Sequence, residues 1–99
     1  RQLEIAMALA GDPKLLLLDE PMAGMGGEES QRMIGFLRAL KDKRAMLLIE
    51  HDMDAVFQLA DRITVLVYGR AIASGTPDEI RANAEVRQAY LGDDAAEPA

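Results

Sequence analysis

The chain has 99 residues, 49% of them hydrophobic, which is enough for one small domain with a single core. It has no cysteine and one histidine, which excludes disulfides, thiolate metal sites, a cysteine nucleophile and a multi-histidine metal site. The formal net charge is −6, aromatic residues make up 4%, and no basic run occurs, so nucleic-acid binding has no electrostatic footprint.

The first predicted element is a helix over residues 3–10, which is rich in alanine and leucine. It is apolar on nearly every side, a pattern that favours a buried helix. Because Arg1 opens inside this pattern, we expect the domain to begin upstream of it. After the stop signal Gly11-Asp12-Pro13, the run Leu15–Leu18 predicts a strand buried on both faces, as in parallel sheets.

The middle of the chain predicts a loop, a helix and a second strand. Residues 23–27 form the loop, and a helix from about residue 28 carries Met33, Leu37 and Leu40 on one face. Residues 45–49 form another apolar strand, and Asp52 is expected to cap a short helix after it.

The last third predicts a hairpin and two helices. Strands over 63–67 and 71–73 flank a turn at 68–70, and residues 76–79 have the composition of a capping box. The last helix is expected to end at Gly92, before an acidic, disordered tail over 93–99. The alternation of strands and helices indicates an α/β fold.

Two carboxylates, Asp19 and Glu20, follow the first predicted strand. The carboxyl end of a buried parallel strand is where α/β sheets bind ligands, and alternating side chains point in different directions. One carboxylate can then hold Mg²⁺ and its waters while the other faces an attacking water. The alternative is a polar strand end that leads into solvent.

His51 directly follows the second predicted strand. If the two strands are parallel neighbours, about 4.8 Å apart, their carboxyl ends meet at one edge. His51 would then reach a phosphate positioned by Asp19 and Glu20. The alternative is a histidine that only begins the next helix.

These segments resemble motifs of the ATP-binding cassette (ABC) ATPases, which are P-loop NTPases. Leu15–Pro21 resembles the Walker B segment, Met22–Gly26 the D-loop, and Glu50-His51-Asp52 the histidine switch. Residues 1–6 resemble the helix after the family signature, and the resemblance extends to about Gly92. It implies the C-terminal part of such a domain: parallel strands with flanking helices, a β-hairpin and a C-terminal helix pair.

The resemblance also implies roles for single residues. Asp19 would hold Mg²⁺ through water, Glu20 would be the general base, and His51 would contact the ATP γ-phosphate and the attacking water. A D-loop contacts the opposite subunit of a head-to-tail dimer that closes around two ATP molecules. Its residues here would be Met22, Ala23, Gly24, Met25 and Gly26. Gly26 departs from the family, which often has aspartate there.

Four segments look like the ATP-binding subunits of branched-chain amino-acid importers: 49–54, 61–63, 75–77 and the ending 83–92. Urea and amide importers share much of this C-terminal part. The importer reading implies an ATP-hydrolysing subunit on the cytoplasmic face of the inner membrane. Its partners would be a second, identical or different, ATP-binding subunit, permease subunits and, indirectly, a periplasmic solute-binding protein. We expect the ATPase part at 1–75, the importer-type extension at 76–92 and the tail at 93–99.

A phosphate-binding Walker A loop, a Q-loop and the signature do not occur in the sequence. In the family, the strand that feeds the phosphate loop lies between the histidine strand and the strand at 63–67. We therefore expect the isolated chain to be inactive and poorly stable, with exposed strand edges. Two other readings remain open: a cassette ATPase that serves translation or DNA repair, and a non-enzymatic module that only binds partners.

Overall fold

The computed structural model describes residues 2–91, and the chain forms two compact units that divide after Leu59. The predicted tail at 93–99 lies outside the described residues. The predicted boundary between residues 75 and 76 does not coincide with this division and stays a prediction.

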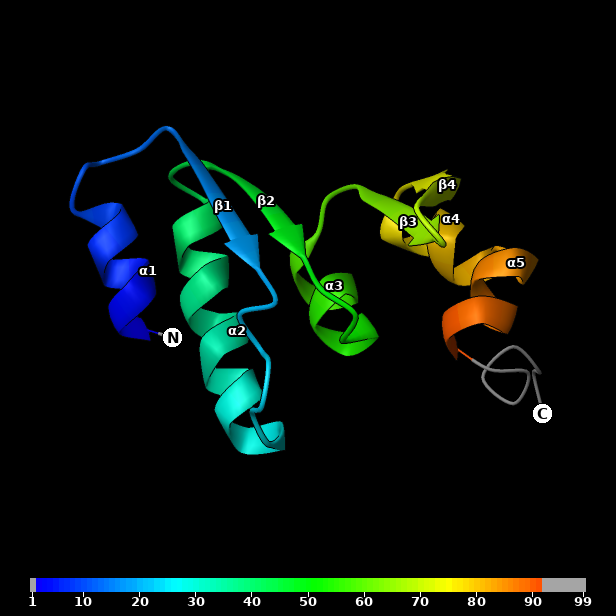
Figure 1. The fold of residues 1–99 in the computed structure, drawn as a ribbon, viewed down its shortest axis with the longest axis horizontal. Coiled ribbons are helices and arrows are strands. Elements are labelled where there is room, and N and C mark those ends of the chain that lie inside the picture. Colours follow the sequence, from blue (N-terminus) through cyan, green and yellow to red (C-terminus); the bar gives the residue numbers. More distant parts are fainter. Residues whose placement is uncertain (1, 92–99) are drawn as a thin grey trace. The chain divides into compact units, whose positions relative to one another are not determined.

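The first unit is built around a strand–helix–strand crossover (Figure 1). Its elements are α1 (Gln2–Leu9), β1 (Leu15–Asp19), α2 (Gly27–Lys41), β2 (Ala45–Ile49) and α3 (Met53–Leu59). β1 and β2 pair in parallel, from Leu15 opposite Ala45 to Asp19 opposite Ile49. Parallel strands need a long crossover, which α2 provides, and the predicted parallel pairing is confirmed.

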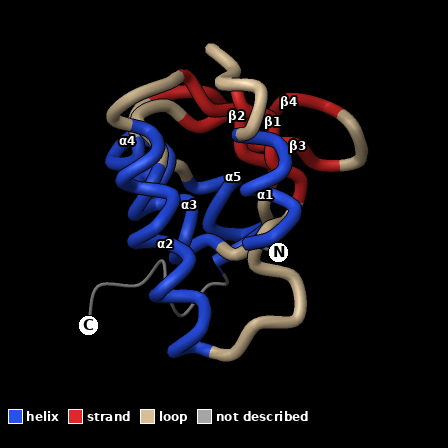
Figure 2. Tube along the Cα trace, turned by 90° about the vertical axis from the view of Figure 1, so that its left-hand side faces the viewer, coloured by secondary structure: helices blue, strands red, loops and turns tan. Residues whose placement is uncertain are grey.

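The core of this unit lies on one face of the β1–β2 sheet. The three helices pack there, on the same side of the strands in Figure 2. The buried core residues are Ile5, Leu16, Leu18, Met22, Met33, Ile34, Leu37, Ala55 and Leu59.

The opposite face of the sheet is open, so the expectation that the strand at Leu15–Leu18 is buried on both faces is wrong for this structure. Leu15 and Leu17 of β1 are 55% and 65% exposed, and Leu47 and Ile49 of β2 are each 57% exposed. The reason is that all three helices of this unit contribute to the core on the other face.

The helix α1 is also less buried than its composition predicts. Ile5 is 4% exposed and packs into the core, whereas Met7 is 69% exposed. The helix therefore buries one side only, although its sequence is apolar on nearly every side.

Both ends of α3 are held by side chains. Asp52 Oδ1 accepts a hydrogen bond from Ala55 N at 3.3 Å, which confirms the predicted cap. Lys41 Nζ donates to the carbonyl oxygen of Leu59 at 2.8 Å, and an Arg38 guanidinium nitrogen donates to that of Gln58 at 3.2 Å. The basic end of α2 thus satisfies carbonyls at the C-terminus of α3, where positive charge is favourable.

The second unit begins with an antiparallel hairpin, as predicted, made of β3 (Ile63–Val67) and β4 (Arg70–Gly75). Tyr68 and Gly69 form its turn with φ of +50° and +74°. Two left-handed residues in a two-residue loop match the twist of the strands. Within the described ranges β2 pairs with β1 and β3 with β4, as expected if a strand between β2 and β3 is missing.

Two capped helices, α4 (Pro77–Ala82) and α5 (Ala84–Val86), follow, and a π-helical turn at Arg87–Leu91 continues α5. The capping box is confirmed: Thr76 N donates to Glu79 Oε1 at 2.9 Å, and Glu79 N donates to Thr76 Oγ1 at 3.2 Å. The hydrogen bonds from Thr76, first through its backbone, hold the pKa of Glu79 below the ordinary value of 4.5. Asn83 caps α5 through Val86 N at 3.1 Å.

Candidate active site

The carboxyl ends of β1 and β2 form one edge, at which the predicted catalytic residues gather. Asp19 is the last residue of β1 and lies opposite Ile49, the last residue of β2. Glu20 N donates to the carbonyl oxygen of Ile49 at 2.7 Å, so the two strand ends stay joined one residue further. Because the next residue after Ile49 is Glu50 and then His51, the turn after β2 begins beside Glu20.

Glu20 leaves the strand through a left-handed backbone conformation with φ of +49°. Such a conformation is sparsely populated by residues other than glycine and persists where surrounding contacts hold it. The sequence argument placed Glu20 on the strand and relied on the alternation of side chains. The structure instead turns the chain at Glu20, and this turn directs its carboxylate towards the histidine.

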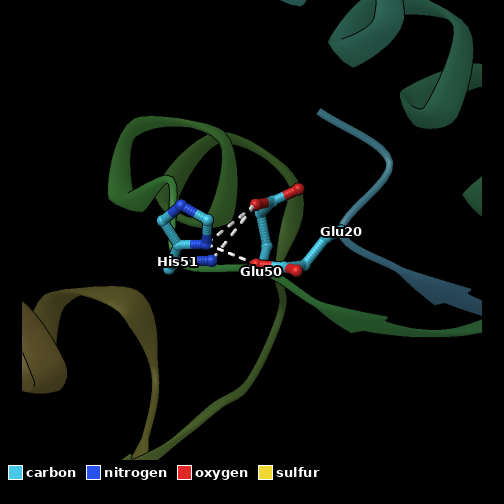
Figure 3. Close-up of side chains that lie close together, drawn as sticks. All are labelled: Glu20, Glu50 and His51. Atoms are coloured by element: carbon cyan, nitrogen blue, oxygen red, sulfur yellow. Dashed lines mark hydrogen bonds and ion pairs between the residues drawn. The ribbon is translucent and has the colours of Figure 1, made fainter. Parts of the chain in front are cut away.

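The structure brings His51 and Glu20 together, as Figure 3 shows. His51 Nδ1 and Glu20 Oε1 are 2.5 Å apart, although the residues are 31 positions apart in sequence. A carboxylate oxygen accepts, so Nδ1–H donates and the Nε2 edge of the ring stays available. The His51 side chain is 73% exposed and that of Glu20 is 46% exposed, so a ligand can reach both.

Glu50 is the functional candidate to which the sequence argument gave no role. Its side chain is 1% exposed, and it lies beside both predicted catalytic residues, Glu20 and His51 (Figure 3). Oxygen or nitrogen atoms of Glu20, Glu50 and His51 all lie within 4.8 Å of one another. The signal in the sequence was a carboxylate directly after an apolar strand, next to a histidine.

Asp19 stands apart from this cluster. Its carboxylate is exposed and has no hydrogen-bond or ion-pair partner among the described residues, and it is not one of the atoms that gather around His51. A free carboxylate at the carboxyl end of a strand fits Mg²⁺, which prefers oxygen ligands and keeps several of its waters. The predicted role of Asp19 therefore suits its position.

The predicted D-loop is only partly available to another chain. Ala23, Gly24 and Gly26 are exposed, and Gly24 has a φ of +76° that favours glycine. Met22, however, is 4% exposed and packs in the core, and Met25 is half-buried against it. The side chain of Met22 therefore packs in the core of its own unit. Among the predicted D-loop residues, only the exposed ones, Ala23, Gly24 and Gly26, remain fully available for a contact with a second subunit.

The comparisons with known proteins point to one family. A family model described as "Branched-chain amino acid ATP-binding cassette transporter" matches residues 72–96. The high-affinity branched-chain amino acid transport ATP-binding protein LivG of Salmonella typhimurium is 43% identical over 95 residues, which are 94% of this chain and 37% of LivG. Over 94% of its length, the chain is thus similar to an ATP-binding protein of branched-chain amino-acid transport.

Solved structures of ATP-binding cassettes share the fold. The ADP conformation of MJ1267, an ATP-binding cassette of an ABC transporter, has a TM-score of 0.78 at 29% identity, covering 91% of this chain and 37% of MJ1267. UvrA2 from Deinococcus radiodurans has a TM-score of 0.74 at 27% identity, covering 98% of this chain and 13% of UvrA2. The expected α/β fold of a cassette ATPase is thus confirmed. Because UvrA2 shares it, the fold alone does not select the branched-chain amino-acid group.

The chain spans 37% of the length of LivG, one of the curated relatives that it matches. The match to the branched-chain amino-acid transporter model lies in the C-terminal part of the sequence, from within β4 through the helices after it. Within residues 2–91, no helix is long and apolar enough to cross a membrane.

Proposed function

We propose that this chain supplies the catalytic carboxylates and histidine of an ATP-hydrolysing subunit that energises a branched-chain amino-acid importer. The observation that carries the proposal is the 2.5 Å contact between His51 and Glu20 at the joined ends of two parallel strands. Ligands bind at this edge in α/β sheets. The match of residues 72–96 to the branched-chain amino-acid transporter model supports the choice of solute.

The chemistry assigns one task to each side chain. Glu20 accepts a proton from a water whose oxygen forms a bond to the γ-phosphorus of ATP, while the bond from that phosphorus to the β–γ bridging oxygen breaks and ADP leaves. His51 donates to Glu20 through Nδ1, and its Nε2 edge faces the γ-phosphate and the attacking water. Asp19 holds Mg²⁺ through water, and a bound Mg²⁺ supplies charge stabilisation at the phosphates.

The rest of the site comes from outside this chain. The phosphate-binding loop, the Q-loop and the signature belong to the full-length protein, and the exposed part of segment 22–26 contacts a second ATP-binding subunit. The isolated 99-residue chain is therefore inactive. The assembled protein binds permease subunits at the cytoplasmic face of the membrane, and a solute-binding protein takes part indirectly.

The competing functions differ in solute or in partner. A urea or amide importer would use the same catalytic residues, and a cassette ATPase outside transport would not bind a permease. A non-enzymatic module would bind partners without hydrolysing ATP. The similarity to LivG over 94% of this chain favours the amino-acid importer.

The test is purification of the full-length protein from membranes, with assays of bound permease, ATP hydrolysis with and without Mg²⁺, and uptake in vesicles. We expect permease co-purification, Mg²⁺-dependent hydrolysis, and uptake of leucine, isoleucine or valine in preference to urea. Hydrolysis without a permease would point to a cassette ATPase outside transport. Absence of hydrolysis in the full-length protein would contradict the enzymatic role.

A further inference from the structure

The feature that the catalytic roles leave unexplained is the buried carboxylate of Glu50. Its side chain is 1% exposed, whereas its neighbour His51 is 73% exposed. Burying a carboxylate away from water is unfavourable unless hydrogen bonds compensate for the lost hydration. The partners of Glu50 therefore indicate what the buried group does.

The hydrogen bonds of Glu50 join two turns that are far apart in sequence. Its Oε2 accepts from the backbone N–H of Met22 at 3.1 Å, across 28 positions. Its Oε1 accepts from the backbone N–H of His51 at 3.1 Å and from that of Asp52 at 3.4 Å. The first donor belongs to the turn after β1 and the other two to the turn after β2, so one carboxylate clamps both turns.

The clamp acts on the backbone and leaves the His51 ring to Glu20. His51 Nδ1 is 3.9 Å from Glu50 Oε1, which is too long for a hydrogen bond, and 2.5 Å from Glu20 Oε1. Glu20 lies two residues before Met22, and His51 directly follows Glu50. A displacement of the Glu50 carboxylate would thus move the backbone beside both catalytic residues.

A metal ion held by Glu20, Glu50 and His51 is the competing reading, since their ligand atoms lie within 4.8 Å of one another. Both oxygens of Glu50 already accept from backbone N–H groups, and one of them accepts twice. Hydrogen bonds to a carboxylate are stronger than those between neutral groups. The observed contacts therefore favour a backbone clamp over a metal ligand.

We propose that Glu50 is a positioning residue for ATP hydrolysis, which holds the turn at Met22 and the turn at His51 in the geometry that brings His51 to Glu20. This inference rests on the proposed function for its kinetic consequence. Its structural part, the clamp on three backbone N–H groups, stands without it.

The kinetic test compares Glu50→Ala, Glu50→Gln and His51→Ala in the full-length protein, with the exposed Glu85→Ala as the matched control. A displacement of about 1 Å in a catalytic group can reduce the rate about 100-fold, so we expect kcat of Glu50→Ala to fall at least tenfold. KM for ATP should stay within about twofold, because Glu50 touches backbone and not substrate. Glu50→Gln should also lose rate, because its amide nitrogen would face a backbone N–H.

A double variant separates positioning from general destabilisation. If Glu50 acts partly through His51, adding Glu50→Ala to His51→Ala should lower kcat by a smaller factor than Glu50→Ala does in the wild type. An equal loss in both backgrounds, or a Glu50→Ala variant with the rate of the wild type, would overturn the proposal. If Glu50→Ala does not fold, the nearly isosteric Glu50→Gln carries the same comparison.

Hydrogen exchange tests the clamp without ATPase activity, so it gives a result even if the proposed function is wrong. Hydrogen exchange at the amides of Met22, His51 and Asp52 should accelerate at least tenfold in Glu50→Gln and stay unchanged in Glu85→Ala. Unchanged exchange at these amides would overturn the clamp. Binding of Zn²⁺ alone that is present in the wild type and lost in Glu50→Gln would overturn it in favour of the metal reading.

Discussion

The predicted catalytic edge of the first unit and the helix caps of the second unit are held by contacts of different range. In the first unit, the contacts that build the site join residues 28 and 31 positions apart, between the turns after β1 and β2. In the second unit, the capping bonds of Thr76 with Glu79 and of Asn83 with Val86 join residues three positions apart. The predicted catalytic edge thus depends on long-range pairing, whereas the helix caps form between near neighbours. Elsewhere in the second unit, the Tyr90 hydroxyl donates to the carbonyl oxygen of Leu66, 24 positions away.

Because of this difference, substitutions in the core of the first unit and at the caps of the second unit should destabilise different parts of the chain. A local motif forms from neighbouring residues, while parallel pairing needs a crossover helix and a core before its contacts form. Substitutions in the core of the first unit should therefore disrupt the catalytic edge and spare the hairpin. Substitutions at the caps should act only on the second unit.

The largest expected effect comes from Leu37→Ala in α2. Leu37 is fully buried at 0% exposure, so its truncation leaves a cavity and should cost about 3 kcal/mol of unfolding free energy. Hydrogen exchange should accelerate at the amides of β1 and β2 but not at those of β3 and β4. Equal acceleration in the hairpin would break the distinction between the units.

The matched control for Leu37→Ala is Leu47→Ala on the open face of the sheet. Leu47 is 57% exposed, so its truncation should cost less than about 1 kcal/mol. A loss as large as that of Leu37→Ala would mean that this face is buried in solution, for example by self-association of the isolated chain.

An intermediate effect is expected from Thr76→Ala in the second unit. The side chain of Thr76 accepts one of the two hydrogen bonds of the capping box, from Glu79 N, and its loss should cost about 1 kcal/mol near neutral pH. The protection of the α4 amides reports this loss. The first unit should be unaffected, and slower exchange in α4 would contradict the role of the cap.

The other side chain of the capping box, that of Glu79, has a predicted pH dependence. The pKa of Glu79 is lower in the folded state than its ordinary value of 4.5, so its stabilising contribution is fully present above that value and is lost as pH falls through the folded pKa. The difference in stability between wild type and Glu79→Gln should therefore shrink below about pH 4.5. The control Thr64→Ala, which removes a hydroxyl contact with Ser74, should show no such change.

The smallest expected effect is a gain from Gly26→Asp. Gly26 is the N-cap of α2, has an extended backbone and makes no side-chain cap bond, in contrast to the capped α4. A Cβ at this position meets nothing within 4 Å, so aspartate can accept from the first turn and add a few tenths of a kcal/mol. Gly24→Asp is the contrasting control, because its φ of +76° strains any side chain. Destabilisation by Gly26→Asp would show that the open space is not accessible.

The sequence predicted the local features of the fold in detail. The capping box at Thr76, the hairpin turn at Tyr68 and Gly69 and the cap at Asp52 all occur as expected, because each depends on residues within a few positions. The parallel pairing was predicted from the order of apolar runs. The exposure of Leu17 and Leu47 was not, since a run of leucines shows which residues can be buried and not what covers them.

The candidate site was predicted only in part, for the same physical reason. The ends of parallel neighbours meet, so the approach of His51 to Glu20 followed from the order of the strands. The left-handed turn at Glu20 departs from the alternation of a strand, and the buried Glu50 carboxylate accepts from a backbone N–H that lies 28 positions away, at Met22. No pattern of neighbouring residues carries that information.

The most direct test of the account is ATP turnover by the full-length protein with Glu20→Gln, beside Glu29→Gln, an exposed glutamate in the first turn of α2. If Glu20 is the general base, turnover should fall at least about 100-fold while ATP stays bound, and Glu29→Gln should behave as the wild type. Turnover near the wild-type rate in Glu20→Gln would contradict the assignment of Glu20 and, with it, the reading of the paired strand ends as the catalytic edge.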